Sequence, residues 1–121
     1  MSIKTRTIRN GAVAIIELKG ALVDVEEIDM LKSAVADFIE QGNKRCVIGL
    51  AKVTYINSSG VGALIAAHTS YRKNGGEVLL TGLTGPVQNL LTITRLIDVF
   101  DVAETIDEAI ENLEAKRSIP T

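Results

Sequence analysis

Hydrophobic and polar residues alternate along the first part of this chain in a way that predicts a β-hairpin. Residues 3–9 alternate loosely and carry charge on one face, which is typical of an edge strand, and residues 12–18 form a more apolar strand. Asn10 and Gly11 stand between the two segments, and this pair favours a tight hairpin turn. We therefore expect the two strands to pair antiparallel.

Beyond the hairpin, helical and extended patterns follow one another. Apolar residues recur at helical spacing from Asp24 to Gly42, and Asp24 and Glu27 have the spacing of a capping box. The later elements are predicted as a strand over 44–50, a helix over 58–73, a strand over 77–81, a helix from Pro86 to about Arg95, a short strand within 96–102 and a helix opened by Thr105 and Glu108. The chain is therefore predicted to be an α/β domain, with a mixed sheet of about five strands and about four helices.

Length and charge limit what kind of protein this is. The 121 residues fit a single domain over 1–121, with a core over about 3–113 and a polar C-terminal tail over 114–121 that we expect to be frayed from Lys116 onward. A formal net charge of −2 gives no general attraction to nucleic acid or to an anionic membrane. No apolar run reaches the roughly 18 residues of a membrane span, and the N-terminus lacks a signal peptide. We therefore expect a cytoplasmic protein whose partner is another protein or a small molecule.

The inventory of reactive side chains argues against catalysis and metal binding. His68 and Cys46 are the only histidine and cysteine, and their spacing suits neither a metal site nor a disulfide within the chain. Cys46 lies in an apolar strand and is predicted to be a structural thiol, and His68 is predicted to be a packed or partly exposed helix residue. A catalytic triad with Ser58 or Ser59 is disfavoured because His68, on the same helix, lies about 15 Å from the helix start. We expect no catalytic residues, no metal, no cofactor and no enzymatic activity.

The remaining candidate functional residues lie in one stretch. There an apolar strand passes through a short turn into the most apolar helix. Asn57, Ser58 and Ser59 are all good helix N-cap residues. Gly60 and Gly62 follow, and such poor helix formers predict close approach of a neighbouring element or a partner. Two interpretations of Ser58 remain open. It is either a simple N-cap, or an exposed hydroxyl whose phosphorylation would add about −1.5 to −2 charges at the positive end of the helix dipole.

Three segments of the chain, taken together with the order of the predicted elements, form a recognisable pattern. They are residues 18–24 before the first helix, the junction 55–62 with the sequence Tyr-Ile-Asn-Ser-Ser-Gly-Val-Gly, and residues 96–100 together with 108–110. In this combination the chain resembles STAS domains, and more narrowly the bacterial anti-sigma factor antagonists. The resemblance extends over about 3–113, and the serine junction is its most specific part. It implies a STAS fold and a protein that acts as a binding switch.

In that family the unmodified antagonist binds an anti-sigma factor, which is also a serine kinase of the GHKL type, and thereby releases a sigma factor. The kinase phosphorylates the first serine of an Asp-Ser-Ser/Thr-Gly motif and so ends the association, and a PP2C-type serine phosphatase restores it. Carried over to this chain, the resemblance implies that Ser58 is the phosphoacceptor, with Ser59 as the second choice. It also implies a partner-binding surface made of Asp24, Asn57, Ser58, Ser59, Gly60 and Val61.

One residue departs from the family pattern, since Asn57 stands where the aspartate of the motif is usual. Asparagine caps a helix as well as aspartate does but carries no charge, so a kinase that reads the carboxylate would recognise this chain less well. Two other functions stay open. One is an adaptor that binds without phosphorylation, as a subunit of a lipid-transporting ABC complex or in a stress-sensing scaffold. The other is a domain that binds a nucleotide or another small ligand on the backbone amides of 58–60.

Overall fold

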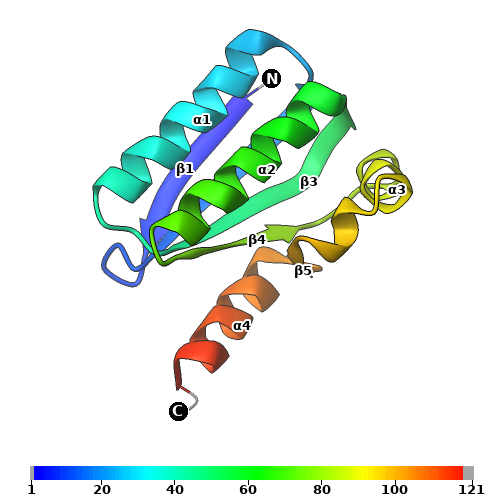
Figure 1. The fold of residues 1–121 in the computed structure, drawn as a ribbon. Helices are drawn as coiled ribbons and strands as arrows, with labels where there is room; N and C mark the ends of the chain where they lie inside the picture. Colours follow the sequence, from blue (N-terminus) through cyan, green and yellow to red (C-terminus); the bar gives the residue numbers. More distant parts are fainter. Residues whose placement is uncertain (1, 119–121) are drawn as a thin grey trace.

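Five strands, four α-helices and one 3-10 helix make up residues 2–118, the part of the chain that the computed structural model describes (Figure 1). In chain order they are β1 (Ser2–Ile8), β2 (Val13–Leu22), α1 (Val25–Glu40), β3 (Arg45–Ile56), α2 (Ser58–Lys73), β4 (Glu77–Thr81), α3 (Gly85–Ile93), η1 (Leu96–Asp98), β5 (Asp101–Ala103) and α4 (Ile106–Ser118). The predicted α/β class, with a mixed sheet of about five strands and about four helices, is confirmed.

The strands form one sheet in the order β1-β2-β3-β4-β5. β1 and β2 pair antiparallel, as the Asn10 and Gly11 turn predicted, and the other neighbours are parallel. Parallel neighbours need crossover connections, which the helices between β2 and β5 supply. The carboxyl ends of β2, β3, β4 and β5 therefore lie at one edge of the sheet, and α1, α2 and α4 begin at that edge.

Helices cover the two faces of the sheet unequally. α1 and α2 lie side by side on one face, and α4 packs on the other (Figure 1). Side chains of β2 point alternately to the two faces, so Ile16 belongs to the larger core with Leu64 of α2, and Ile15 belongs to the smaller core with Leu113 of α4. The near-continuous apolar runs of the inner strands reflect burial on both faces.

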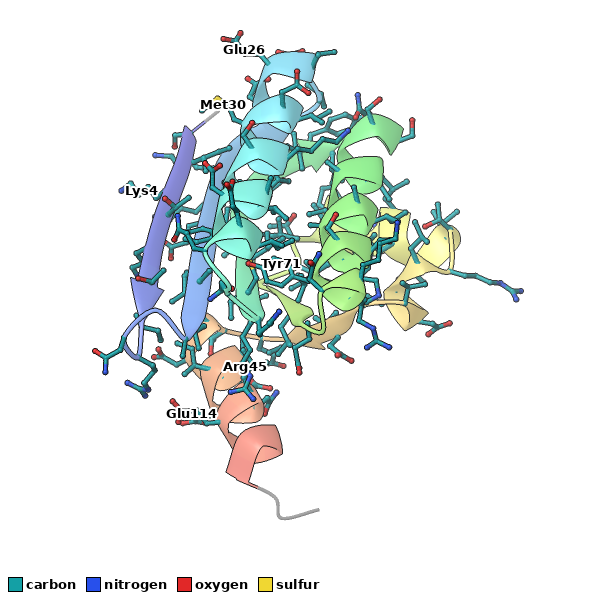
Figure 2. The ribbon with its side chains drawn as sticks, turned by 60° about the vertical axis from the view of Figure 1, so that its left-hand side comes forward. Lys4, Glu26, Met30, Arg45, Tyr71 and Glu114 are labelled. Atoms are coloured by element: carbon teal, nitrogen blue, oxygen red, sulfur yellow. The ribbon has the colours of Figure 1, made fainter. Side chains whose placement is uncertain are left out.

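A buried polar contact ties α2 to the hairpin turn. Tyr71 of α2 is fully buried (Figure 2), and its hydroxyl donates a hydrogen bond to Asn43 Oδ1 over 2.8 Å. The Asn43 amide donates in turn to the Gly11 carbonyl oxygen over 2.9 Å. Cys46 is buried beside Tyr71, and burial raises the pKa of the Cys46 thiol to about 12. The thiol therefore stays protonated at neutral pH, which confirms the prediction of a structural cysteine.

Two elements differ from their predicted boundaries. β3 runs to Ile56 and not to residue 50, because its more polar second half pairs with the end of β2. Residues 96–102 do not form a single strand, since η1 comes first and β5 is confined to Asp101–Ala103. Before η1, Arg95 takes a left-handed conformation with φ of 63°, a backbone geometry that ends a helix and redirects the chain.

The last helix, α4, extends further than the sequence predicted. It continues through Ser118, so the tail expected to fray from Lys116 begins within a helix. Residues 119–121 lie outside the described part of the chain. Neither α4 nor any other helix of residues 2–118 is long and apolar enough to cross a membrane.

Candidate functional site

The N-termini of α1 and α2 lie side by side at one edge of the sheet (Figure 1). α1 begins at Val25 after β2 ends at Leu22, and α2 begins at Ser58 after β3 ends at Ile56. Leu22 and Ile56 are register partners in the parallel pair of β2 and β3, so the two helices start next to each other. The two segments that the sequence singled out are therefore brought together.

Asn57 is the N-cap of α2 and also joins the two helix starts. Its Oδ1 accepts a hydrogen bond from the Gly60 backbone N–H over 2.9 Å. Its Nδ2 donates to the Val23 carbonyl oxygen, in the loop before α1, over 3.2 Å. An aspartate in this position would lack the second hydrogen bond, because its ionised side chain has no N–H to donate. Asn57 therefore caps α2 and fixes the loop that carries Asp24.

Ser58 is the first residue of α2 and not its cap. Both Ser58 and Ser59 are exposed, and among the described residues neither hydroxyl takes part in a hydrogen bond. The interpretation of Ser58 as a simple N-cap is therefore wrong. Asn57 takes that role because the helix already begins at Ser58. The Ser58 hydroxyl is left accessible to another protein.

Gly60 and Val61, two residues of the predicted partner-binding surface, are buried against the sheet and are not accessible. A Cβ atom on Gly60 would lie 2.3 Å from the Leu22 carbonyl oxygen and 2.6 Å from Ile56 Cγ1. The close approach predicted at Gly60 is thus made by the chain itself, at the ends of β2 and β3. At Gly62 an added Cβ would meet nothing within 4 Å, so no neighbouring element of the described chain approaches this glycine, and close approach by a partner there stays a prediction.

Asp24 takes the N-cap position of α1, but its carboxylate makes no capping hydrogen bond. The sequence therefore predicted the helix start correctly, whereas the Asp24 side chain does not form its half of the predicted capping box with Glu27. The carboxylate stays exposed beside Val23, whose carbonyl oxygen accepts from Asn57. The accessible part of the predicted surface, which we call the Ser58 surface, consists of Asp24, Asn57, Ser58 and Ser59.

Negative charge is distributed unevenly between the two helix N-termini. The first turn of α1 contains Glu26 and Glu27, which offset the positive end of that helix dipole, whereas the first turn of α2 contains no acidic residue. A phosphate on Ser58 would meet the unopposed dipole of α2, which is favourable. The same group would add negative charge near Asp24 and so change the charge that the Ser58 surface presents to another protein.

Two exposed apolar side chains lie at the same edge of the sheet and were not predicted as part of the site. Val25, next to Asp24, is 75% exposed, and Tyr55, close before Asn57, is 57% exposed. Exposed apolar and aromatic side chains beside polar groups are common in protein-binding surfaces. The sequence pattern gave no signal, because an apolar residue at a strand end or a helix start is as compatible with the core as with the surface.

His68 lies further along α2 and packs against the segment after α3. Its ring makes an edge contact with Phe100 at a centroid distance of 5.6 Å. The side chain is half-buried, which agrees with the predicted packed or partly exposed helix residue. This contact joins α2 to the segment around Phe100.

Comparison with known proteins agrees with this geometry. The family model for the STAS domain matches residues 4–109. One relative, the anti-sigma F factor antagonist of Paenibacillus polymyxa, is 24% identical over 115 residues, which cover 94% of this chain and 97% of that protein. Two solved structures share the fold. The anti-sigma factor antagonist SpoIIAA in its unphosphorylated form has a TM-score of 0.81 and 19% identity, over 99% of this chain and 100% of that chain. The Bacillus cell fate determinant SpoIIAA in the phosphorylated form has a TM-score of 0.74 and 18% identity, over 93% of this chain and 99% of that chain. Because the family model covers most of its length, the chain belongs to the STAS domain family.

Proposed function

We propose that this chain is an anti-sigma factor antagonist that binds an anti-sigma factor through the Ser58 surface and is released when Ser58 is phosphorylated. The observation that carries the proposal is the exposed Ser58 hydroxyl at the start of α2, where Asn57 has already taken the capping role. Two comparisons support it. The relative from Paenibacillus polymyxa is named an anti-sigma F factor antagonist, and one structural neighbour is a phosphorylated form.

In the unmodified state, the partner docks on the Ser58 surface and on the exposed side chains of Val25 and Tyr55. The partner is an anti-sigma factor that is itself a GHKL-type serine kinase, and its capture frees the sigma factor. Phosphorylation then adds about −1.5 to −2 charges to the docked surface. Because this charge lies near Asp24 and would have to be desolvated in the complex, the complex dissociates. A PP2C-type phosphatase removes the phosphate and restores binding.

The fold survives this modification because the cap of α2 does not involve Ser58. Asn57 keeps its hydrogen bonds to Gly60 and Val23 in both states, and the helix dipole favours negative charge at the first helical position. The switch therefore acts on surface charge and not on folding. This chain supplies the acceptor hydroxyl only, since the kinase and the phosphatase carry out the chemistry.

A phosphorylation-independent adaptor is the second candidate, and Asn57 is the observation that favours it. Without the carboxylate of the motif, a kinase has one charged group fewer to recognise. The Ser58 surface would then bind a partner permanently, in a lipid-transporting ABC complex or a stress-sensing scaffold. A nucleotide bound on the amides of 58–60 fits the geometry less well, because the Gly60 N–H already donates to Asn57 Oδ1.

Intact-mass spectrometry after incubation with ATP and candidate GHKL kinases tests the proposal. The matched variants are Ser58→Ala and Ser59→Ala, which change neighbouring exposed serines. We expect one phosphate on the wild-type chain and on Ser59→Ala, and none on Ser58→Ala. A phosphate on Ser58→Ala but not on Ser59→Ala would move the site to Ser59. Stable binding to a partner kinase without any phosphate transfer would favour the adaptor.

A further inference from the structure

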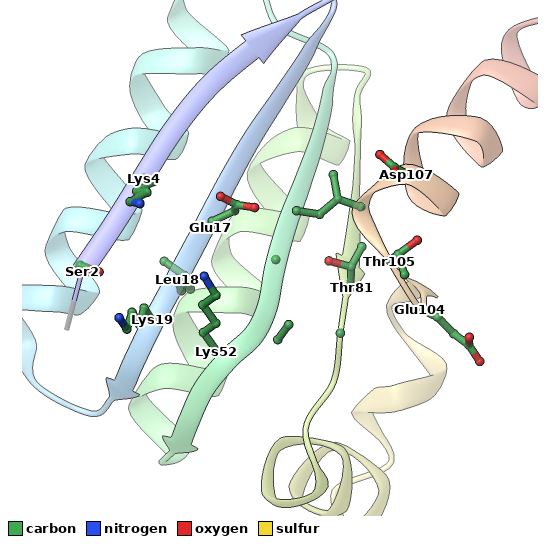
Figure 3. Close-up of a pocket in the computed structure, with 14 residues that line it drawn as sticks. Ser2, Lys4, Glu17, Leu18, Lys19, Lys52, Thr81, Glu104, Thr105 and Asp107 are labelled. Atoms are coloured by element: carbon green, nitrogen blue, oxygen red, sulfur yellow. The ribbon is translucent and has the colours of Figure 1, made fainter.

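The face of the sheet opposite α1 and α2 is only partly covered, and a cavity of about 380 Å³ lies in its open part (Figure 3). α4 packs over the half of this face that holds Val13, Ile15 and Val47. Further along β2 the same face continues with Glu17 and Lys19, which line the cavity. The cavity therefore lies between β1, β2 and β3 on one side and the start of α4 on the other.

Three lysines line one side of the cavity: Lys4 of β1, Lys19 of β2 and Lys52 of β3. Lys19 and Lys52 are register partners on neighbouring strands, and like charges placed opposite each other destabilise a sheet. Among the described residues none of these lysines takes part in a hydrogen bond or an ion pair. The Glu17 carboxylate, which also lines the cavity, pairs with Arg6 over 3.2 Å. This side of the cavity therefore keeps positive charge that the chain itself leaves unpaired.

The opposite side of the cavity carries hydroxyl and carboxylate groups. Thr81 lines it at the end of β4, Thr105 lines it directly before α4, and Glu104 and Asp107 lie close to Thr105 in the sequence. Figure 3 shows Thr81, Thr105 and Asp107 on the side of the cavity opposite Lys19 and Lys52, and shows the Glu104 carboxylate pointing away from these lysines. Carboxylates accept hydrogen bonds from hydroxyl groups and repel anions. The charge across the cavity thus selects a molecule that is anionic at one end and carries hydroxyl groups at the other.

We propose that this cavity binds a small phosphate ester of a polyol, such as a sugar phosphate. The phosphate lies at Lys4, Lys19 and Lys52, and a hydroxyl group of the ligand donates to Asp107. Lysine ammonium groups commonly bind phosphate, and a dianion offsets the repulsion between two neighbouring lysines better than a single carboxylate does. The volume of about 380 Å³ lies near the lower end of the range of roughly 300–1,000 Å³ for ligand pockets, which suits a small molecule.

This cavity is separate from the Ser58 surface. None of the four residues of that surface lines the cavity, which opens on the other face of the sheet. The inference therefore goes beyond the proposed function, and either one can fail without the other. A chain that does not bind a phosphate ester can still be phosphorylated on Ser58 and can still bind its protein partner.

Titration of the isotope-labelled chain with ribose 5-phosphate, followed by backbone amide resonances, tests this site. We expect saturable shifts at Lys19, Lys52 and Thr81, and no saturable shifts with ribose at the same concentrations. Lys19→Gln and Lys52→Gln should each weaken binding by roughly tenfold, since each removes a charged hydrogen bond. Lys73→Gln, which changes an exposed lysine in the last turn of α2, should leave the affinity unchanged.

Thermal unfolding tests whether the variants are folded as stably as the wild-type chain. Lys19→Gln and Lys52→Gln should be at least as stable as the wild-type chain, because each relieves the repulsion between these two lysines. The proposal would be overturned if neither ribose 5-phosphate nor glycerol 3-phosphate gave saturable shifts, or if Lys52→Gln bound as tightly as the wild type. Equal affinity for inorganic phosphate and ribose 5-phosphate would contradict the role given to Asp107.

Discussion

The position of Ser58 depends on how closely α2 begins against β2, and the substitution Gly60→Ala tests that contact. The added Cβ would lie 2.3 Å from the Leu22 carbonyl oxygen and 2.6 Å from Ile56 Cγ1. The first of these obstacles is backbone, which cannot rotate away, so we place the overpacking cost at the upper end of its usual range, about 3 kcal/mol. Alanine regains about 1 kcal/mol of helix propensity relative to glycine. We therefore expect Gly60→Ala to lower the free energy of unfolding by about 2 kcal/mol.

Gly62→Ala is the matched control, since it makes the same substitution on the same helix. An added Cβ at Gly62 meets nothing within 4 Å, so this variant should gain about 0.5 to 1 kcal/mol. Urea denaturation of the two variants and the wild-type chain measures both effects. If Gly60→Ala were as stable as the wild type, or were stabilised like Gly62→Ala, α2 would not begin against β2 as described. The position assigned to Ser58 would then be wrong.

Other substitutions separate capping, buried hydrogen bonding and thiol chemistry. Asn57→Ala removes two side-chain hydrogen bonds and should cost about 1 kcal/mol or more in urea unfolding, whereas Ser58→Ala should change stability by no more than about 0.5 kcal/mol. Equal losses would contradict the capping role of Asn57. Tyr71→Phe leaves Asn43 Oδ1 without its donor and should cost about 1 to 3 kcal/mol, and a neutral result would mean that this buried hydrogen bond is not formed. The pKa of Cys46 is raised from 9.0 to about 12, so the folded state holds this proton more tightly than the unfolded state does. The stability that the buried, protonated Cys46 thiol contributes is therefore fully present below pH 9.0 and is lost as the pH rises toward about 12. A thiol reagent at mildly alkaline pH should modify this cysteine only after unfolding, and rapid modification of the folded chain would refute its burial.

Local sequence signals predicted most of the elements on the α1 and α2 side of the sheet. The bounds of α2, Ser58–Lys73, and of β4, Glu77–Thr81, agree with the prediction because helix-capping residues and glycines mark their ends. The second half of β3 was missed because Lys52, which follows Ala51, interrupts its apolar run. Both residues line the open face of the sheet, where a strand does not need apolar side chains.

At the site, residue types predicted the place but not the individual roles. Asn57, Ser58 and Ser59 can each cap a helix, and the sequence alone does not decide among them. The decision depends on tertiary contact, since Gly60 must pack against the end of β2. The hydrogen bond from Asn57 to Val23 likewise joins residues 34 positions apart, which periodicity does not reveal. Contacts of this kind become visible only once the sheet register is known.

The most direct measurement compares two forms of the chain, unmodified and carrying one phosphate on Ser58, in their affinity for the anti-sigma factor that phosphorylates it. Calorimetric titration without ATP gives both affinities, and Ser58→Ala is the control that the kinase leaves unmodified. We expect the unmodified chain and Ser58→Ala to bind equally, and the phosphorylated chain to bind at least roughly tenfold more weakly, because the added charge must be desolvated near Asp24. Equal affinity of the phosphorylated and unmodified chains would contradict a switch at Ser58.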